Sequence, residues 1–96
     1  MRRDEALRIV ADHREQVAKF GVDSLAIFGS VARDEAGPNS DVDVLVEFRE
    51  PVGYFRLFDL EDFLTKIFHR PVDLFTPGSL PPRVQAEVLK EAVRAA

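Results

Sequence analysis

The sequence contains no cysteine and no long run of apolar residues. Without cysteine the chain can form neither disulfides nor thiolate metal sites. No apolar segment approaches the roughly 18–20 residues that are needed to span a bilayer. The N-terminal segment MRRDEALRIVADHRE carries charges throughout and lacks the apolar region of a signal peptide. These absences predict a soluble, cytoplasmic protein that does not act at a membrane.

Excess positive charge is also missing, since the formal net charge is −4 at pH 7. Proteins that hold nucleic acid through many phosphates are usually basic. A polynucleotide is therefore disfavoured as the main partner, whereas a small phosphorylated ligand is compatible with this charge.

What is present is enough apolar material for a core: 46% of the 96 residues are hydrophobic, including eight phenylalanines. This length predicts a single domain over residues 1–96. A domain of about 100 residues buries only about 60–70% of its unfolded surface. Some apolar surface is therefore expected to be left for a partner.

Periodicity and turn residues predict alternating helices and strands. We expect helices at 4–20, 52–70 and 81–93, strands at 24–28, 41–48 and 71–76, a short helical turn after Ser30, and a loop at 37–40. The predicted order is α-β-(short α)-β-α-β-α. The fold class is α/β (α+β), with helices packed on a small mixed three-stranded sheet.

Two aspartates in the strand 41–48 call for an explanation, because strands are depleted in aspartate. Asp41 and Asp43 are two residues apart, so both side chains project to one face, about 6–7 Å apart along the strand. A divalent cation would relieve their repulsion, and hard oxygen ligands favour Mg²⁺. The alternative is that both are solvated residues on an open sheet face.

Gly29, Ser30 and Arg33 follow the strand 24–28 and predict an anion-binding corner. The glycine allows close approach of a ligand to the backbone, and a guanidinium one turn further on can reach phosphate. If Arg33 has no such role, it is an ordinary surface arginine.

The predicted topology brings these groups together. If strands 24–28 and 41–48 are antiparallel neighbours, Gly29 and Ser30 lie beside Asp41 and Asp43. Strand 71–76 follows a crossover helix and should run parallel to 41–48, which places Asp73 level with the aspartate pair.

This pattern resembles the DNA polymerase β-like nucleotidyltransferase superfamily. The resemblance rests on Gly29-Ser30, ten intervening residues, Asp41-Val42-Asp43-Val44, and a later apolar-Asp-apolar at 72–74. The fuller strings FGSVARDEAGPNSDVDVLVEF and PVDLFTPGSL are similar to the minimal nucleotidyltransferase (MNT) branch, often the antitoxin partner of a HEPN-domain toxin. The implied core is the superfamily's palm-type fold.

The resemblance implies roles for six residues. Gly29, Ser30 and Arg33 would bind the phosphates of a nucleoside triphosphate, and Asp41, Asp43 and Asp73 would be catalytic and bind two Mg²⁺ ions. Asp73 would also help to deprotonate the acceptor. The implied reaction transfers an NMP, AMP from ATP, to a tyrosine hydroxyl of a HEPN-domain protein encoded by a neighbouring gene.

Two positions depart from the family pattern. Members often have Gly where this chain has Asp34, and Asp where it has Asn39. Neither position is a metal ligand in the pattern, so a change of loop geometry is expected rather than a loss of chemistry. The extra domain of larger members is also missing, so substrate selection would depend partly on the partner.

The predicted helix 52–70 has more apolar residues than one buried stripe needs. Five of them share the expected core face: Leu57, Leu60, Leu64, Ile67 and Phe68. Tyr54, Phe55 and Phe58 fall on a different arc and predict an interface. The alternative is that the N-terminal or C-terminal helix covers them.

Two further functions compete with the enzyme. The chain could be an antitoxin that neutralises its partner by binding alone, as its small size and surplus aromatics favour. A small-molecule transferase of the aminoglycoside type is weaker, since such enzymes carry additional helices for the acceptor. The sequence leaves open the base preference, the acceptor, the number of nucleotides transferred and the oligomeric state, a homo-oligomer included.

Overall fold

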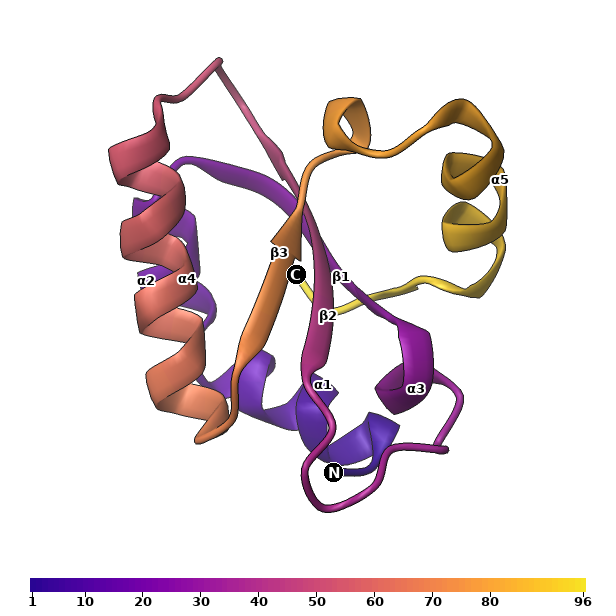
Figure 1. Cartoon of the computed structure of the whole chain (residues 1–96). Helices are drawn as coiled ribbons and strands as arrows, with labels where there is room; N and C mark the ends of the chain where they lie inside the picture. Colours follow the sequence, from indigo (N-terminus) through magenta and orange to yellow (C-terminus); the bar gives the residue numbers. More distant parts are fainter.

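The structure is a computed structural model that describes residues 1–96 as a four-stranded sheet with helices on both faces (Figure 1). The strands are β1 (Val22–Phe28), β2 (Val42–Phe48), β3 (Val72–Phe75) and β4 (Val93–Arg94), in the spatial order β3-β2-β1-β4. The helices are α1 (Arg3–Asp12), α2 (Arg14–Lys19), α3 (Gly29–Ala32), α4 (Tyr54–Phe68) and α5 (Pro82–Glu91), with a 3-10 turn η1 at Pro77–Ser79. None of the helices combines the length and apolar character needed to cross a membrane.

The three predicted strands pair as expected. β1 is antiparallel to β2, and β3 is parallel to β2 because α4 carries the chain back across the sheet. The register sets Phe28 opposite Asp43 on one side and Asp73 opposite Asp43 on the other. The end of β1 and the starts of β2 and β3 therefore meet at one place.

The predicted three-stranded sheet and the helix reaching residue 93 were wrong at the C-terminus. α5 ends at Glu91, and Val93–Arg94 forms β4 against Ile27 and Ala26 of β1. Backbone N–H groups of Ala95 and Ala96 also donate to the Leu25 carbonyl, at 2.8 and 3.1 Å. These residues satisfy backbone groups at the edge of β1, a long-range gain that local periodicity cannot reveal.

The predicted helix 4–20 is broken at His13. Its backbone, at φ −117° and ψ 21°, is not helical, and the Nδ1 atom lies 2.8 Å from the Ile9 carbonyl oxygen. Two shorter helices, α1 and α2, result. The predicted end of this helical segment at residue 20 agrees with Gly21, which takes a left-handed φ of 83° that suits glycine.

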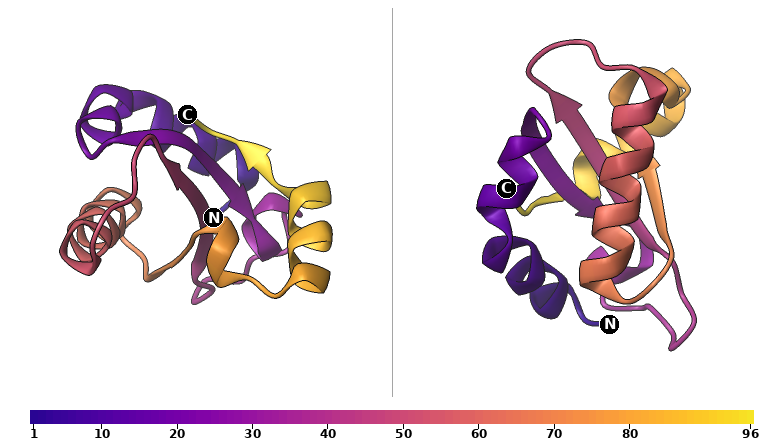
Figure 2. Two further views of the ribbon diagram at one scale, coloured as in Figure 1. Left: turned by 90° about the horizontal axis from the view of Figure 1, so that it is seen from above. Right: turned by 90° about the vertical axis from the view of Figure 1, so that its left-hand side faces the viewer.

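The main core lies between the sheet and the layer formed by α1, α2 and α4 (Figure 2). The side chains of β2 alternate between the two faces of the sheet, and Val42, Val44 and Val46 are all fully buried in this core. From α4, Leu60, Leu64 and Phe68 are buried there, and Ile67 packs against them, whereas Leu57 is only half-buried.

α5 lies on the opposite face of the sheet (Figure 2). There Val88 packs in a small cluster with Phe28 and Leu45. Leu45 alternates with the valines of β2, so the same strand supplies the large core on one face and this smaller cluster on the other.

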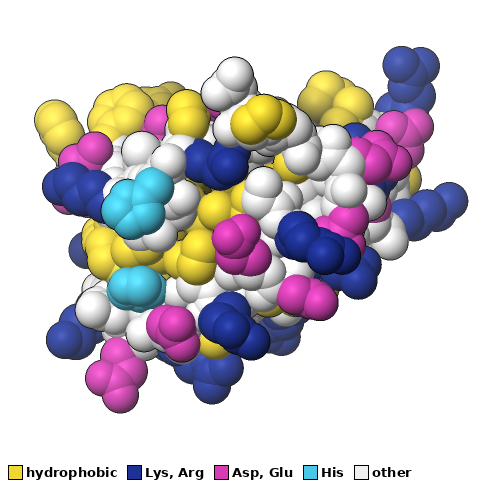
Figure 3. All heavy atoms as spheres, turned by 90° about the horizontal axis from the view of Figure 1, so that it is seen from below, with side chains coloured by type: hydrophobic (Ala, Val, Ile, Leu, Met, Phe, Trp, Pro, Cys, Tyr) yellow, Lys and Arg dark blue, Asp and Glu magenta, His cyan; other side chains and the backbone are white.

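The aromatic side chains at the start of α4 are uncovered. Tyr54, Phe55 and Phe58 are 77%, 86% and 61% exposed. The alternative that a terminal helix covers them is therefore wrong for this chain. Elsewhere charges of both signs are intermixed, as on the face in Figure 3, without the basic field typical of nucleic-acid binders.

Candidate active site

The strand register gathers the predicted carboxylates at one end of the sheet. Asp43 on β2 is half-buried and pairs with Asp73 on β3 through the parallel register. Asp41 lies just before β2, and both Asp41 and Asp73 are exposed to solvent. The convergence expected from the sequence is thus present in the backbone.

Asp43 has an unfavourable electrostatic environment. Partial burial raises the pKa of its carboxyl group above the ordinary value, and the nearby carboxylates of Asp73, Asp41 and Glu91 raise it further. Arg33 acts in the opposite direction on the same pKa, but it does not offset the other causes. A cation beside Asp43 would therefore be stabilised by uncompensated negative charge.

Gly29 is required where the backbone passes Asp43. Its φ is 72°, in the left-handed region, and a Cβ atom added there would collide with Oδ2 of Asp43. Two residues on, Val31 is fully buried in the main core. The turn that carries Gly29 and the half-buried Ser30 is therefore anchored in the main core.

Arg33 and the Gly29 backbone share one acceptor that the sequence analysis missed, Glu91 at the end of α5. The Gly29 N–H donates to Oε1 of Glu91 at 2.9 Å, and Nη1 of Arg33 donates to Oε2 at 2.8 Å. Nε of Arg33 also donates to Glu35, at 3.1 Å. These hydrogen bonds, that to Glu91 first, raise the pKa of Arg33, so its guanidinium is always charged.

Only the C-terminal strand could have revealed Glu91, which lies 62 residues from Gly29. In the antiparallel register Val93 stands opposite Ile27. If this antiparallel register is extended from Ile27 to Gly29 on one side and from Val93 back to Glu91 on the other, Glu91 stands opposite Gly29. A helix predicted through Val93 is incompatible with this register, so Glu91 could not be placed in the site.

A fit to Mg²⁺ depends on which oxygen donors the site offers. No group of three or more His, Cys, Asp or Glu side chains is placed so that it could hold a metal ion by itself. The donors are nevertheless carboxylate oxygens with unbalanced negative charge around Asp43. Mg²⁺ usually binds through one or two carboxylates and completes its shell with waters and phosphate oxygens, so the donor set fits a metal that arrives with a nucleotide.

Asp34 shows why a family pattern would have glycine there. Its φ is 57°, a left-handed conformation that glycine adopts without strain and that aspartate tolerates better than most residues. One carboxylate oxygen also accepts a hydrogen bond from the Arg3 N–H at 2.6 Å. The turn after α3 is thus kept with a different residue.

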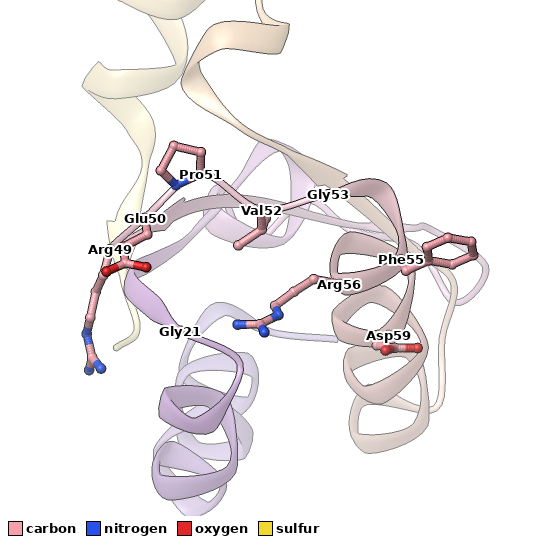
Figure 4. Close-up of a pocket in the computed structure, with 9 residues that line it drawn as sticks. All are labelled: Gly21, Arg49, Glu50, Pro51, Val52, Gly53, Phe55, Arg56 and Asp59. Carbon is pink, nitrogen blue, oxygen red and sulfur yellow. The ribbon is translucent and has the colours of Figure 1, made fainter.

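One hollow lies away from these carboxylates. It encloses about 680 Å³ between the end of β2 and the start of α4, and Figure 4 shows Arg56 reaching across it toward Gly21. Arg56 donates to the Phe20 carbonyl at 3.1 Å, which ties α4 to the turn after α2. Because none of the residues predicted to bind nucleotide or metal lines it, we interpret this hollow as a structural junction.

Comparison with known proteins identifies the family. Residues 10–95 match the nucleotidyltransferase domain family. The protein adenylyltransferase MntA of Thermococcus cleftensis is 35% identical over 91 residues, which cover 94% of this chain and 92% of that protein. A Methanocaldococcus jannaschii protein, provisionally named a protein adenylyltransferase, is 42% identical over 77 residues, covering 79% of this chain and 90% of its own.

Solved structures agree. A structure provisionally named a minimal nucleotidyltransferase superimposes with a TM-score of 0.76 at 35% identity, over 91% of this chain and 93% of that chain. A toxin–antitoxin crystal structure with AMP-PNP gives a TM-score of 0.71 at 17% identity, over 100% of this chain and 73% of that chain, and shows likeness of fold alone. With its matching fold and its register of carboxylates, the chain belongs to the nucleotidyltransferase domain family, in its minimal branch, and is an enzyme of that type.

Proposed function

We propose that this chain transfers AMP from ATP to a tyrosine hydroxyl of a HEPN-domain protein and thereby acts as its antitoxin. The observation that carries the proposal is the register that sets Asp43 beside Asp73 and next to the Gly29 turn. The similarity to protein adenylyltransferase MntA over 94% of this chain supports the choice of donor and of a protein acceptor. A related solved complex is described as a tri-AMPylated Shewanella oneidensis HEPN toxin with its MNT antitoxin.

In this proposal the phosphates lie against the turn after β1. The backbone at Gly29 and Ser30 and the Arg33 guanidinium would bind the β- and γ-phosphates. Asp41, Asp43 and Asp73 would hold Mg²⁺, which when bound stabilises charge on the entering and leaving oxygens. The exposure of Asp41 and Asp73 leaves room for the acceptor to approach.

The proposed transfer is a single displacement at the α-phosphorus. The acceptor oxygen forms a bond to the α-phosphorus, and the bond from that phosphorus to the bridging oxygen of the β-phosphate breaks. Pyrophosphate leaves with the electron pair of that bond. The hydroxyl proton passes to the Asp73 carboxylate, which lies at the open edge of the site and can release it to water.

The test is intact-mass spectrometry of the HEPN-domain protein after incubation with ATP, Mg²⁺ and this chain. We expect a mass gain of one or more AMP groups, lost with Asp41→Asn or Asp43→Asn. The matched control is Asp12→Asn, a change of the same kind at an exposed position on α1, which should leave the gain intact. A gain that survives both site variants would overturn the assigned roles of Asp41 and Asp43.

A second candidate function is neutralisation by binding alone, which the exposed aromatic patch of Tyr54, Phe55 and Phe58 favours. The rings of Tyr54 and Phe58 stack with centroids 6.5 Å apart on a solvent-exposed surface. If no nucleotide gives a mass gain while a stable complex still forms, this function replaces the first. The Asp41→Asn, Asp43→Asn double variant would then still neutralise the partner.

A further inference from the structure

The end of α5 places a carboxylate on the anion-binding donors of the site. Both oxygens of Glu91 are used, one by the Gly29 N–H and the other by the Arg33 guanidinium. The Arg33 pair is also an ion pair at 2.8 Å, in which the Glu91 side chain is only 30% exposed. These are the hydrogen bonds that two oxygens of a phosphate would accept from the same donors.

Glu91 is a costly neighbour for the rest of the site. Its negative charge adds to that of Asp41, Asp43 and Asp73 in the same small region. A carboxylate whose only task was to orient Arg33 would gain that pairing while increasing this repulsion. The arrangement is more economical if the carboxylate occupies the donors only while no phosphate is bound.

The local structure allows Glu91 to leave without unfolding anything. It is the last residue of α5, and the following residue, Ala92, is already extended at φ −64° and ψ 134°. Rotation of the Glu91 side chain would break no hydrogen bond of the helix backbone. α5 itself would stay anchored by Val88 on one side and by the pairing of β4 with β1 on the other.

We propose that Glu91 is an internal competitor for the nucleotide phosphates, which must displace its carboxylate from Gly29 and Arg33. The inference rests on the proposed function, because it concerns the same nucleotide site. It assigns to Glu91 a part in specificity: a triphosphate that brings a divalent cation can replace a carboxylate, whereas a weakly charged ligand cannot. The donors would also never be left without an acceptor in the free protein.

The test is isothermal titration calorimetry of AMP-PNP with Mg²⁺ against the wild-type chain and Glu91→Gln. The glutamine keeps the shape and neutral hydrogen bonds but loses the charge. We expect roughly 3- to 10-fold tighter binding, as two charge-assisted hydrogen bonds at a partly exposed position become neutral ones. Inorganic triphosphate with Mg²⁺ should show a gain of the same size, because the affected donors bind phosphate rather than base.

Glu87→Gln is the matched control, since it removes the same charge from an exposed position one turn earlier on α5. Its binding should equal that of the wild type. An equal gain in this control would reduce the effect to net charge and overturn the inference. Thermal melts check that each variant is folded, and Glu91→Ala provides a second variant expected to bind more tightly.

The remaining outcomes separate the two proposals. Unchanged or weaker binding by both Glu91 variants, with normal binding by the wild type, would overturn the competitor and make Glu91 a residue that positions Arg33. If neither the wild type nor any variant binds AMP-PNP or triphosphate, the proposed function itself fails. Binding by Glu91→Gln alone would support the competitor in its strongest form.

Discussion

The two faces of the sheet are covered to very different extents, although β2 contributes to both. On the face toward α1, α2 and α4, 15 buried residues form one continuous cluster, whereas the face toward α5 has a cluster of only three, Phe28, Leu45 and Val88. The carboxylates and Arg33 lie at the end of that second face. Most of the buried apolar residues lie on one side of the sheet, and the charged residues of the candidate site lie on the other.

The groups proposed to bind the nucleotide and the group proposed to compete with it are anchored in different clusters. The turn bearing Gly29 is anchored by Val31 in the larger cluster. Glu91 belongs to α5, whose single buried residue, Val88, is in the smaller one. The turn proposed to bind phosphate is thus anchored in the larger cluster, while the proposed competing carboxylate is on the element with fewer buried residues.

The strongest test of this comparison is a pair of truncations in the two clusters. Leu64→Ala removes a fully buried side chain from the larger cluster and should lower the free energy of unfolding by about 2–5 kcal/mol. Val88→Ala in the smaller cluster should cost only about 1–2 kcal/mol, the value of two buried methyl groups. Urea unfolding followed by circular dichroism measures both, and equal losses would contradict the proposed division of stability.

A smaller effect is expected at Gly29, which directly follows the end of β1. Gly29→Ala must place a Cβ against Oδ2 of Asp43 in a left-handed conformation, and should cost about 1–3 kcal/mol of unfolding free energy. Gly78→Ala is the control, because an added Cβ there meets no atom within 4 Å. That variant should stay within about 0.5 kcal/mol of the wild type. Similar losses in both would show that Gly29 is not sterically required.

The smallest expected effect has the opposite sign. Asp43→Asn removes one of two like charges on adjacent strands, and in EDTA it should stabilise the fold by about 0.2–1 kcal/mol. Because the pKa of Asp43 is raised in the folded protein, wild-type stability increases as the pH falls through that pKa. The advantage of the asparagine should therefore be greatest at neutral pH and disappear below the ordinary aspartate pKa.

Thermal melts of wild type and Asp43→Asn across this pH range measure the difference. Glu47→Gln, at an exposed position on the same strand, provides the control and should show little change. If Asp43→Asn is less stable than the wild type in EDTA, the carboxylate has a favourable partner and the description of unbalanced charge is wrong.

Local sequence patterns predicted what lies within a strand or between neighbouring strands. The two-residue spacing of Asp41 and Asp43 placed both side chains on one face of the strand, and the crossover rule placed Asp73 level with them. Both follow from short-range geometry. The assigned roles of Ser30, Arg33 and the three aspartates remain predictions until they are measured.

Contacts between distant parts of the chain could not be predicted from local sequence patterns. Val93 continues a helical pattern in the sequence, yet it pairs with Ile27 of β1, because the edge of that strand offers free backbone groups. The break at His13 was likewise not visible in a continuous amphipathic pattern. Glu91 was missed for the first of these reasons, since its place in the site depends on the β4 register.

The sheet ends in two short strands, and this limits how another protein can associate with it. β3 has four residues and β4 has two, so neither edge offers a long ladder of free backbone groups. Short edges resist unwanted strand pairing between copies of a protein. They are also poor templates for adding a strand from a partner. Short edges of this kind therefore favour recognition through side chains displayed by the helices and turns.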